Sequence, residues 1–309
     1  MQSKKSIFYT GAAIVLTIVI MASYSAYSTY RLNDKMDVVS GRIDTVNFFI
    51  KDVEKDLGKG VYIAGFRTLI GFNQYISTNG TFIDDVNARF KESFLNGTIN
   101  RQPVALMKGT TFTDWANRIS AESNKVDISL NFTISGVRIN HTDPWNIDIG
   151  VNMTLTIQDK KNTSSWIRNR EVSSRISITG FEDPLYVVNS GGRVTNTIVQ
   201  SNITNFVVNA DTSNLMMHAN NSWYKANNAS PSFLMRFQGD TGNSTFGIES
   251  LVNLAEFQAQ NVNIKDRSIV DSVYFSTKQT TNYRINQTPE WFKLDQGHLA
   301  FYQAQNSTI

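Results

Sequence analysis

The chain contains no cysteine among its 309 residues, and only three histidines and five prolines. Without cysteine there is no disulfide, no thiol nucleophile and no thiolate metal ligand. A chain of this length buries a core without disulfides, so their absence is compatible with either side of a membrane. The three histidines are scattered, and a formal net charge of +3 is too small to indicate nucleic-acid binding. We therefore predict no metal, no cofactor and no nucleic-acid partner.

Patterns of catalytic residues are also missing. Gly58-Lys59-Gly60 lacks the spacing of a phosphate loop, and Ser190-Gly191-Gly192 is typical of a turn rather than a nucleophile elbow. A glycosidase needs only two carboxylates, for which Asp84-Asp85, Asp143 and Glu182-Asp183 are the candidates. The first pair begins a predicted helix and the last pair lies in a predicted turn. We predict that the protein is not an enzyme, and a carbohydrate-active enzyme of the envelope remains the third alternative.

Charge is absent from residues 6–30, a run that follows two lysines. Roughly 20 apolar residues span a bilayer as a helix, and Tyr24, Tyr27 and Tyr30 recur at helical spacing where an interfacial aromatic belt would lie. The alternative is a cleaved signal peptide with its cleavage site near Ser23–Ser25. The length of the run favours a retained anchor. Residues 1–30 are therefore predicted to form a leader and a transmembrane helix, with membrane lipid as a partner.

Acceptor motifs for asparagine-linked sugar occur twelve times, where composition alone predicts about six. The acceptors are Asn79, Asn96, Asn131, Asn140, Asn152, Asn162, Asn202, Asn220, Asn228, Asn243, Asn286 and Asn306. Basic residues flank both ends of the apolar run, so the positive-inside rule does not decide its direction. The acceptor asparagines decide the direction instead. They favour a cytoplasmic N-terminus, with the rest of the chain extracellular at the cell surface and carrying N-linked glycans.

A heptad seam follows the apolar run, with about three repeats of apolar residues spaced alternately by three and four. Its members are Leu32, Met36, Val39, Ile43, Val46, Ile50, Val53 and Leu57. The seam predicts either self-association, as a coiled coil or in a filament, or packing of the helix on its own domain. Phe48 and Phe49 lie off the seam and favour a helix that is covered on more than one side. Gly58 and Gly60 are expected to interrupt or bend it.

The rest of the chain divides by its period. Residues 31–125 are predicted to hold the heptad helix and a helical region, with a buried helix at Val61–Ile76 and others at residues 84–95 and 113–119. From Val126 the apolar period becomes two. Strands at residues 126–135, 146–158 and 166–179 are predicted to form an antiparallel meander with a kink near Gly136.

Beyond the meander, a hairpin turn is expected at residues 189–192 and a short helix at residues 211–217. Further strands are expected at residues 232–237, 245–248, 270–275 and 299–302. The predicted fold class is α+β: a long N-terminal transmembrane and amphipathic helix, a small helical region, and an antiparallel β-rich extracellular domain at residues 126–309.

This layout of a basic leader, an apolar helix that continues as an amphipathic one, and a glycosylated β-rich head resembles the type IV pilin-like proteins of archaea. That resemblance implies assembly through the N-terminal helix and removal of the leader near Lys5-Ser6. The chain is also similar to uncharacterised single-span archaeal envelope proteins, in segments Asp56–Arg67, Gly180–Tyr186, Pro231–Arg236 and Trp291–Asp295. The predicted function is a non-enzymatic, membrane-anchored surface glycoprotein with a structural or adhesive role. The alternative is a pilin-like filament subunit.

Overall fold

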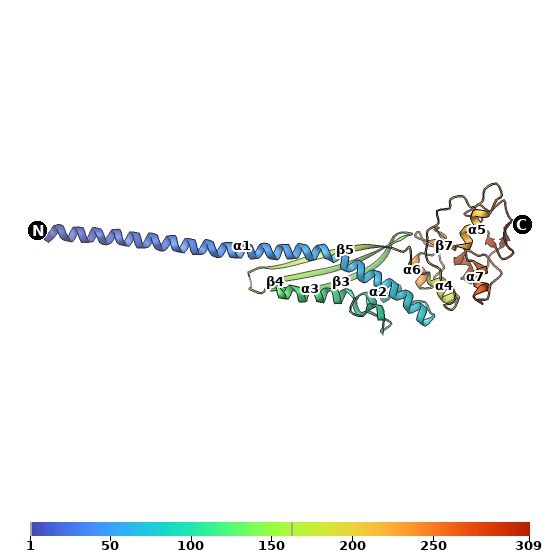
Figure 1. The fold of residues 1–309 in the computed structure, drawn as a ribbon, viewed down its shortest axis with the longest axis horizontal. Helices are drawn as coiled ribbons and strands as arrows, with labels where there is room; N and C mark the ends of the chain where they lie inside the picture. Colours follow the sequence, from blue (N-terminus) through green and yellow to red (C-terminus); the bar gives the residue numbers. More distant parts are fainter. Residues whose placement is uncertain (1, 162) are drawn as a thin grey trace.

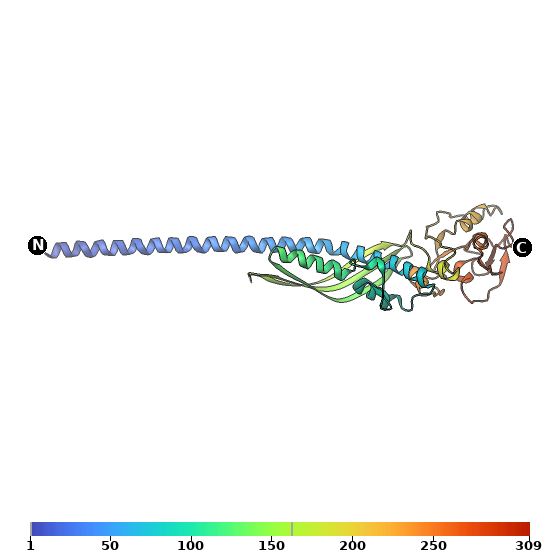
Figure 2. The ribbon, with the colours of Figure 1, turned by 60° about the horizontal axis from the view of Figure 1, so that its bottom comes forward.

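The computed structural model describes residues 2–161 and 163–309, and the side chains of residues 15–161 and 163–309. The molecule is elongated, with the N-terminus at one end and the C-terminus in a knob at the other (Figures 1 and 2). Its longest element is the helix α1 (Gln2–Asn79), which is about 115 Å long at the usual rise per residue. The predicted α+β class, long N-terminal helix and antiparallel sheets are confirmed.

Helix α1 runs through Gly58 and Gly60 without interruption, so the predicted break is wrong. Gly60 instead allows helix α3 (Phe112–Lys125) to approach, because a Cβ there would lie 2.8 Å from Cε2 of Trp115. The buried helix predicted at Val61–Ile76 is the last part of α1 rather than a separate element. Val61, Leu69 and Phe72 are fully buried in it, as expected for that segment.

A small helical layer follows α1. It comprises α2 (Val86–Asn96), the strands β1 (Thr98–Ile99) and β2 (Gln102–Pro103), the 3₁₀ turn η1 (Ala105–Met107) and α3 (Phe112–Lys125). Asp85 caps α2, and Thr111 and Asp114 form a capping box on α3. Phe90, Phe94, Phe112 and Trp115 then stack in sequence and join the two helices in one core. Both predicted helices are confirmed.

The predicted meander is also confirmed. Strands β3 (Ile128–Asp143), β4 (Asn146–Asp159) and β5 (Ser165–Ser177) pair antiparallel in the order β3-β4-β5, and a register shift falls between Ile134 and Gly136. The inner face packs on α1 through fully buried residues such as Ile147, Ile149 and Val151. The outer face carries serine, threonine, asparagine and charged residues. Figure 1 shows the sheet lying along the second half of α1.

The knob from residue 178 onward is built from short pieces around a second core, which includes Leu215, Leu254, Val270 and Phe292. Its helices are α4 (Pro184–Asn189), α5 (Ser213–Asn220), α6 (Phe233–Phe237), α7 (Leu254–Ala259) and α8 (Asp271–Tyr274). Its strand pairs are β6 (Tyr224–Ala226) with β7 (Ile248–Ser250), and β8 (Asn282–Arg284) with β9 (Lys293–Asp295).

Several predictions for the knob are wrong. Residues 232–237 and 270–275 form the helices α6 and α8, and residues 299–302 form turns. The turn at residues 189–192 follows helix α4 rather than joining two strands. Short apolar runs buried on all sides do not distinguish strand from helix, which explains these errors. The helix predicted at residues 211–217 is present as α5, and the strand predicted at residues 245–248 is confirmed only in its last residue, which begins β7.

Candidate functional site

The heptad seam divides into two parts with different surroundings. Its C-terminal members are buried: Val46, Ile50, Val53 and Leu57 lie in the core formed with the sheet. Its N-terminal members are not, since Leu32 is 58% exposed, Met36 66% and Val39 41%. Ile43 is half-buried at the boundary. Intrachain packing therefore accounts for one half of the seam and leaves the other half open to a partner.

Two polar contacts hold the covered half of α1 on the sheet. Arg170 of β5 donates from Nε and Nη2 to Oε1 of Glu54, at 2.9 and 2.6 Å. Ser174 Oγ donates to the carbonyl oxygen of Gly58 at 2.7 Å. Both come from β5, so this strand follows the helix closely.

Arg42 marks the point where the sheet begins. Its Nε and Nη2 donate to Oδ1 of Asp159 at 2.9 and 2.8 Å, and Nη2 also reaches the carbonyl oxygens of Val126 and Asp127. The side chain of Asp159 is buried. Hydrogen bonds from Thr163 and the Arg42 guanidinium lower the pKa of Asp159 to about 2. One arginine thus joins α1 to the ends of α3, β3 and β4. The sequence analysis did not predict this contact.

The apolar run lies at the free end of α1. Val15, Leu16, Ile18 and Ile20 are each about 60% exposed. Across the residues that the structure describes, no helix combines the length and apolarity needed to cross a membrane. Residues 6–14 of the predicted span lie outside the described side chains. Residues 15–30, the second part of the run, form a helix whose apolar side chains are exposed.

The acceptor asparagines share one property. The eleven that the structure describes are all exposed, whereas seven of the other twenty asparagines are half-buried. Asn131 and Asn152 lie on the outer face of the sheet, where each alternates with residues of the buried face. Asn162 lies outside the described residues. Exposure is what a glycosyltransferase requires of its acceptor, so these positions are sterically available for glycosylation.

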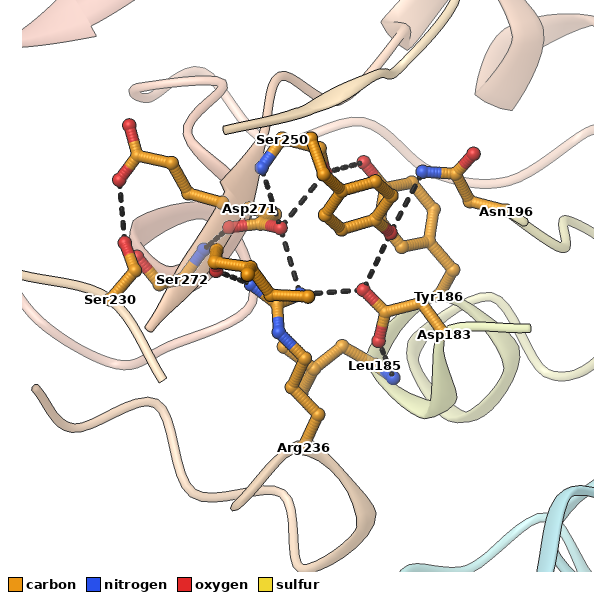
Figure 3. A network of polar contacts seen from close by, with 12 residues as sticks. Asp183, Leu185, Tyr186, Asn196, Ser230, Arg236, Ser250, Asp271 and Ser272 are labelled. Carbon is orange, nitrogen blue, oxygen red and sulfur yellow. Dashed lines mark hydrogen bonds and ion pairs between the residues drawn. The ribbon is translucent and has the colours of Figure 1, made fainter. Parts of the chain in front are cut away.

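The knob is organised by a fully buried arginine. Arg236 of α6 donates from Nη1 to Oδ2 of Asp183 at 2.5 Å and to Oδ2 of Asp271 at 2.8 Å, and from Nη2 to the carbonyl oxygen of Ile248. Figure 3 shows the guanidinium between the two carboxylates. Burial would lower the pKa of Arg236, but the two aspartates outweigh it and raise the pKa.

Neutral partners complete this network. Tyr224 Oη donates to Oδ2 of Asp183 at 2.7 Å, and Ser250 donates its backbone N–H and its hydroxyl to Asp271. Asp183 also accepts from the backbone of Leu185 at the start of α4. The network thus joins α4, α6, β6, β7 and α8. An arginine inside the apolar run Phe233–Phe237 was the sequence signal that could have revealed it.

A second buried ionic cluster lies around His298. Its Nδ1 is 2.8 Å from Oδ1 of Asp295, and its Nε2 is 3.4 Å from Oε2 of Glu249. Burial would lower the pKa of His298, but the hydrogen bond with Asp295 and the ion pair with Glu249 raise it to about 10, so this histidine is charged at neutral pH. His218 differs, because burial lowers its pKa to about 4 and leaves it neutral. No set of three or more metal-ligating side chains suited to a metal ion is found among the described residues.

Four of the five carboxylates considered for a glycosidase pair have separate structural partners. Asp84 pairs with Arg89, Asp85 caps α2, and Asp143 accepts from the backbone of Trp145 in the β3–β4 turn. Asp183 belongs to the Arg236 network. Two adjacent aromatic pairs that could bind a sugar by stacking are packed in the knob instead. Tyr224 and Phe292 are fully buried, and Trp223 and Trp291 are partly buried against the second core.

Comparison of the chain with protein-family models, with curated proteins and with solved structures finds no match.

Proposed function

We propose that this protein is a membrane-anchored cell-surface glycoprotein with a structural or adhesive role, whose folded head is held away from the membrane by helix α1. The observation that carries the proposal is the contrast along α1. Its first half presents apolar side chains outward, and its second half is enclosed by the sheet. Between Tyr30 and Arg42 the helix would rise about 18 Å from the end of the apolar run to the base of the sheet.

The acceptor asparagines support an outward head. They occur at the last residue of α1, on the helical layer, on the sheet and on the knob, and every described one is exposed. Sugars at these positions would surround the head and leave α1 bare before its last residue, Asn79. The apolar run would then lie in the lipid, and Arg31, whose guanidinium carbon lies 6.0 Å from the ring centroid of Tyr27, would lie at its outer boundary.

Two measurements on native cells test this proposal. Glycopeptide mass spectrometry should find sugar on asparagines of the head, and protease added to intact cells should degrade the head while leaving a fragment of α1 with the membrane. A head that carries no sugar and survives protease until the cells are lysed would refute the outward topology.

The runner-up is a pilin-like filament subunit. The feature that favours it is the N-terminal half of the seam, since Leu32, Met36 and Val39 offer an exposed apolar stripe to a second copy of the chain. N-terminal sequencing separates the two candidates: loss of residues 1–5 supports the filament subunit, and an intact Met1 argues against it.

A further inference from the structure

A groove of about 520 Å³ lies between the end of β3, helix α2 and helix α6. Ile139, Leu234, Met235 and Phe246 give it an apolar surface, and Asn140 with other amide side chains provides polar groups. Its volume falls in the range of sites that hold small organic ligands. The groove lies where the sheet meets the knob, because β3 belongs to the sheet and α6, which carries Arg236, belongs to the knob.

His141 lines this groove with a neutral ring, and two hydrogen bonds hold the ring in place. Its Nε2 accepts the backbone N–H of Leu234 at 3.3 Å, and its Nδ1 lies 3.3 Å from the carbonyl oxygen of Asp143. A neutral ring with the proton on Nδ1 satisfies both contacts. Burial lowers the pKa of His141, in agreement with the neutral form. The ring stacks on Phe246 with 5.8 Å between centroids, so an aromatic surface is held at the groove.

Asn140 is both a residue of the groove and a glycan acceptor. It is exposed, as is Thr142 two residues later at an irregularity of the strand. Asn79 is the informative contrast: it lines a smaller cavity of about 200 Å³, and its Nδ2 donates to the carbonyl oxygen of Tyr75. The hydrogen bonds found among the described residues do not engage the amide nitrogen of Asn140. Because Asn140 alternates along β3 with Ile139 and His141, its side chain lies on the opposite side of the strand, and a sugar attached there would begin at the rim of the groove.

We propose that the oligosaccharide linked to Asn140 passes over the edge strand β3 into this groove, with a C–H face of one of its sugars packed on Phe246 and its hydroxyls bonded to the amide side chains. Sugars combine apolar C–H surfaces with many hydroxyls, which fits an apolar floor with neutral amides. The covalent link supplies a high effective concentration, so modest contacts are sufficient. A sugar bound in this way would contact both β3 and α6, and would therefore connect the sheet to α6. The inference rests on the outward, glycosylated head of the proposed function.

The test compares hydrogen exchange in variants of the full glycosylated chain. Thr142→Ala removes the acceptor motif while leaving Asn140 in place, and Thr142→Ser keeps the motif. Thr133→Ala removes the Asn131 motif on the outer face of the same sheet and serves as the matched control. We expect amide exchange at Leu234 and Met235 to rise about tenfold in Thr142→Ala and to stay unchanged in the other two.

Phe246→Ala separates attachment of the sugar from its packing. It should leave the glycan on Asn140 and still raise exchange at Leu234 and Met235. Unchanged exchange in Thr142→Ala, or an Asn140 that carries no sugar while Asn131 does, would overturn the inference and leave the proposed function standing. The groove would then serve a peptide or a second chain. Absence of sugar at every acceptor would refute the inference together with the outward topology.

Discussion

The two halves of the heptad seam on helix α1 share one apolar pattern and differ in what surrounds it. Leu57, near the end of the seam, is 1% exposed beneath the sheet, whereas Leu32, at its beginning, is 58% exposed. A heptad pattern identifies the face of a helix that is to be buried, but it does not identify the element or molecule that buries it. In this chain, the sheet covers the second half and the first half is exposed. We propose lipid or a second copy of the chain as the cover of the first half. The boundary is the contact of Arg42 with Asp159.

The largest expected difference comes from one substitution made in each half. Leu57→Ala should lower the free energy of unfolding of the head by about 2–5 kcal/mol, because it leaves a cavity in the core. Leu32→Ala should change it by less than about 0.5 kcal/mol, because the side chain is exposed. Chemical denaturation of the full chain in detergent measures both. Equal losses would mean that the first half is also packed within the chain.

Two glycines of α1 give a finer comparison. Gly60→Ala should destabilise the head by about 1–3 kcal/mol, because the new methyl group meets the ring of Trp115. At Gly58 a Cβ would meet nothing within 4 Å, so Gly58→Ala should stabilise the helix by up to about 1 kcal/mol. Thermal denaturation of the pair checks the signs. Stabilisation by both would show that α3 does not press on α1 at Gly60.

Acid should loosen the boundary between the halves. The pKa of Asp159 is lowered to about 2 in the folded chain from an ordinary value of 3.8. A lowered pKa stabilises the folded state above the ordinary value, and the stabilisation is lost as the pH falls from about 4 towards 2. Hydrogen exchange around residues 42–46 should therefore rise across that interval.

Arg42→Met is the control for the acid experiment. It should raise exchange around residues 42–46 at neutral pH and weaken the dependence on acid, although the bonds from Thr163 to Asp159 remain. A full acid response in this variant would show that other carboxylates control the boundary.

The sequence predicted the layer around α1 well and the knob poorly, for a physical reason. Strands β3 to β5 have one buried and one polar face, so their period of two is visible in the sequence. Residues 233–237 and 270–275 are buried on most sides and too short to display a period. Their conformation depends on partners distant in the chain, such as Asp183 and Asp271 on either side of Arg236. The fold of the knob follows from that network more than from local preference.

The candidate sites show the same division. The seam and the acceptor motifs were visible because they are patterns along the chain. The groove beside Asn140 was not, because it forms only where β3, α2 and α6 meet. Likewise, the link between Arg42 and Asp159 spans 117 positions, and nothing near either residue indicates the other.

Labelling of single cysteines tests the outward topology most directly, since a chain without cysteine gives no background. Ala255→Cys places a thiol on an exposed position of α7, and Ser3→Cys places one before the apolar run. A membrane-impermeant maleimide added to intact cells should label Ala255→Cys, and should label Ser3→Cys only after the membrane is opened. Protection of Ala255→Cys in intact cells, with labelling only after lysis, would contradict the account.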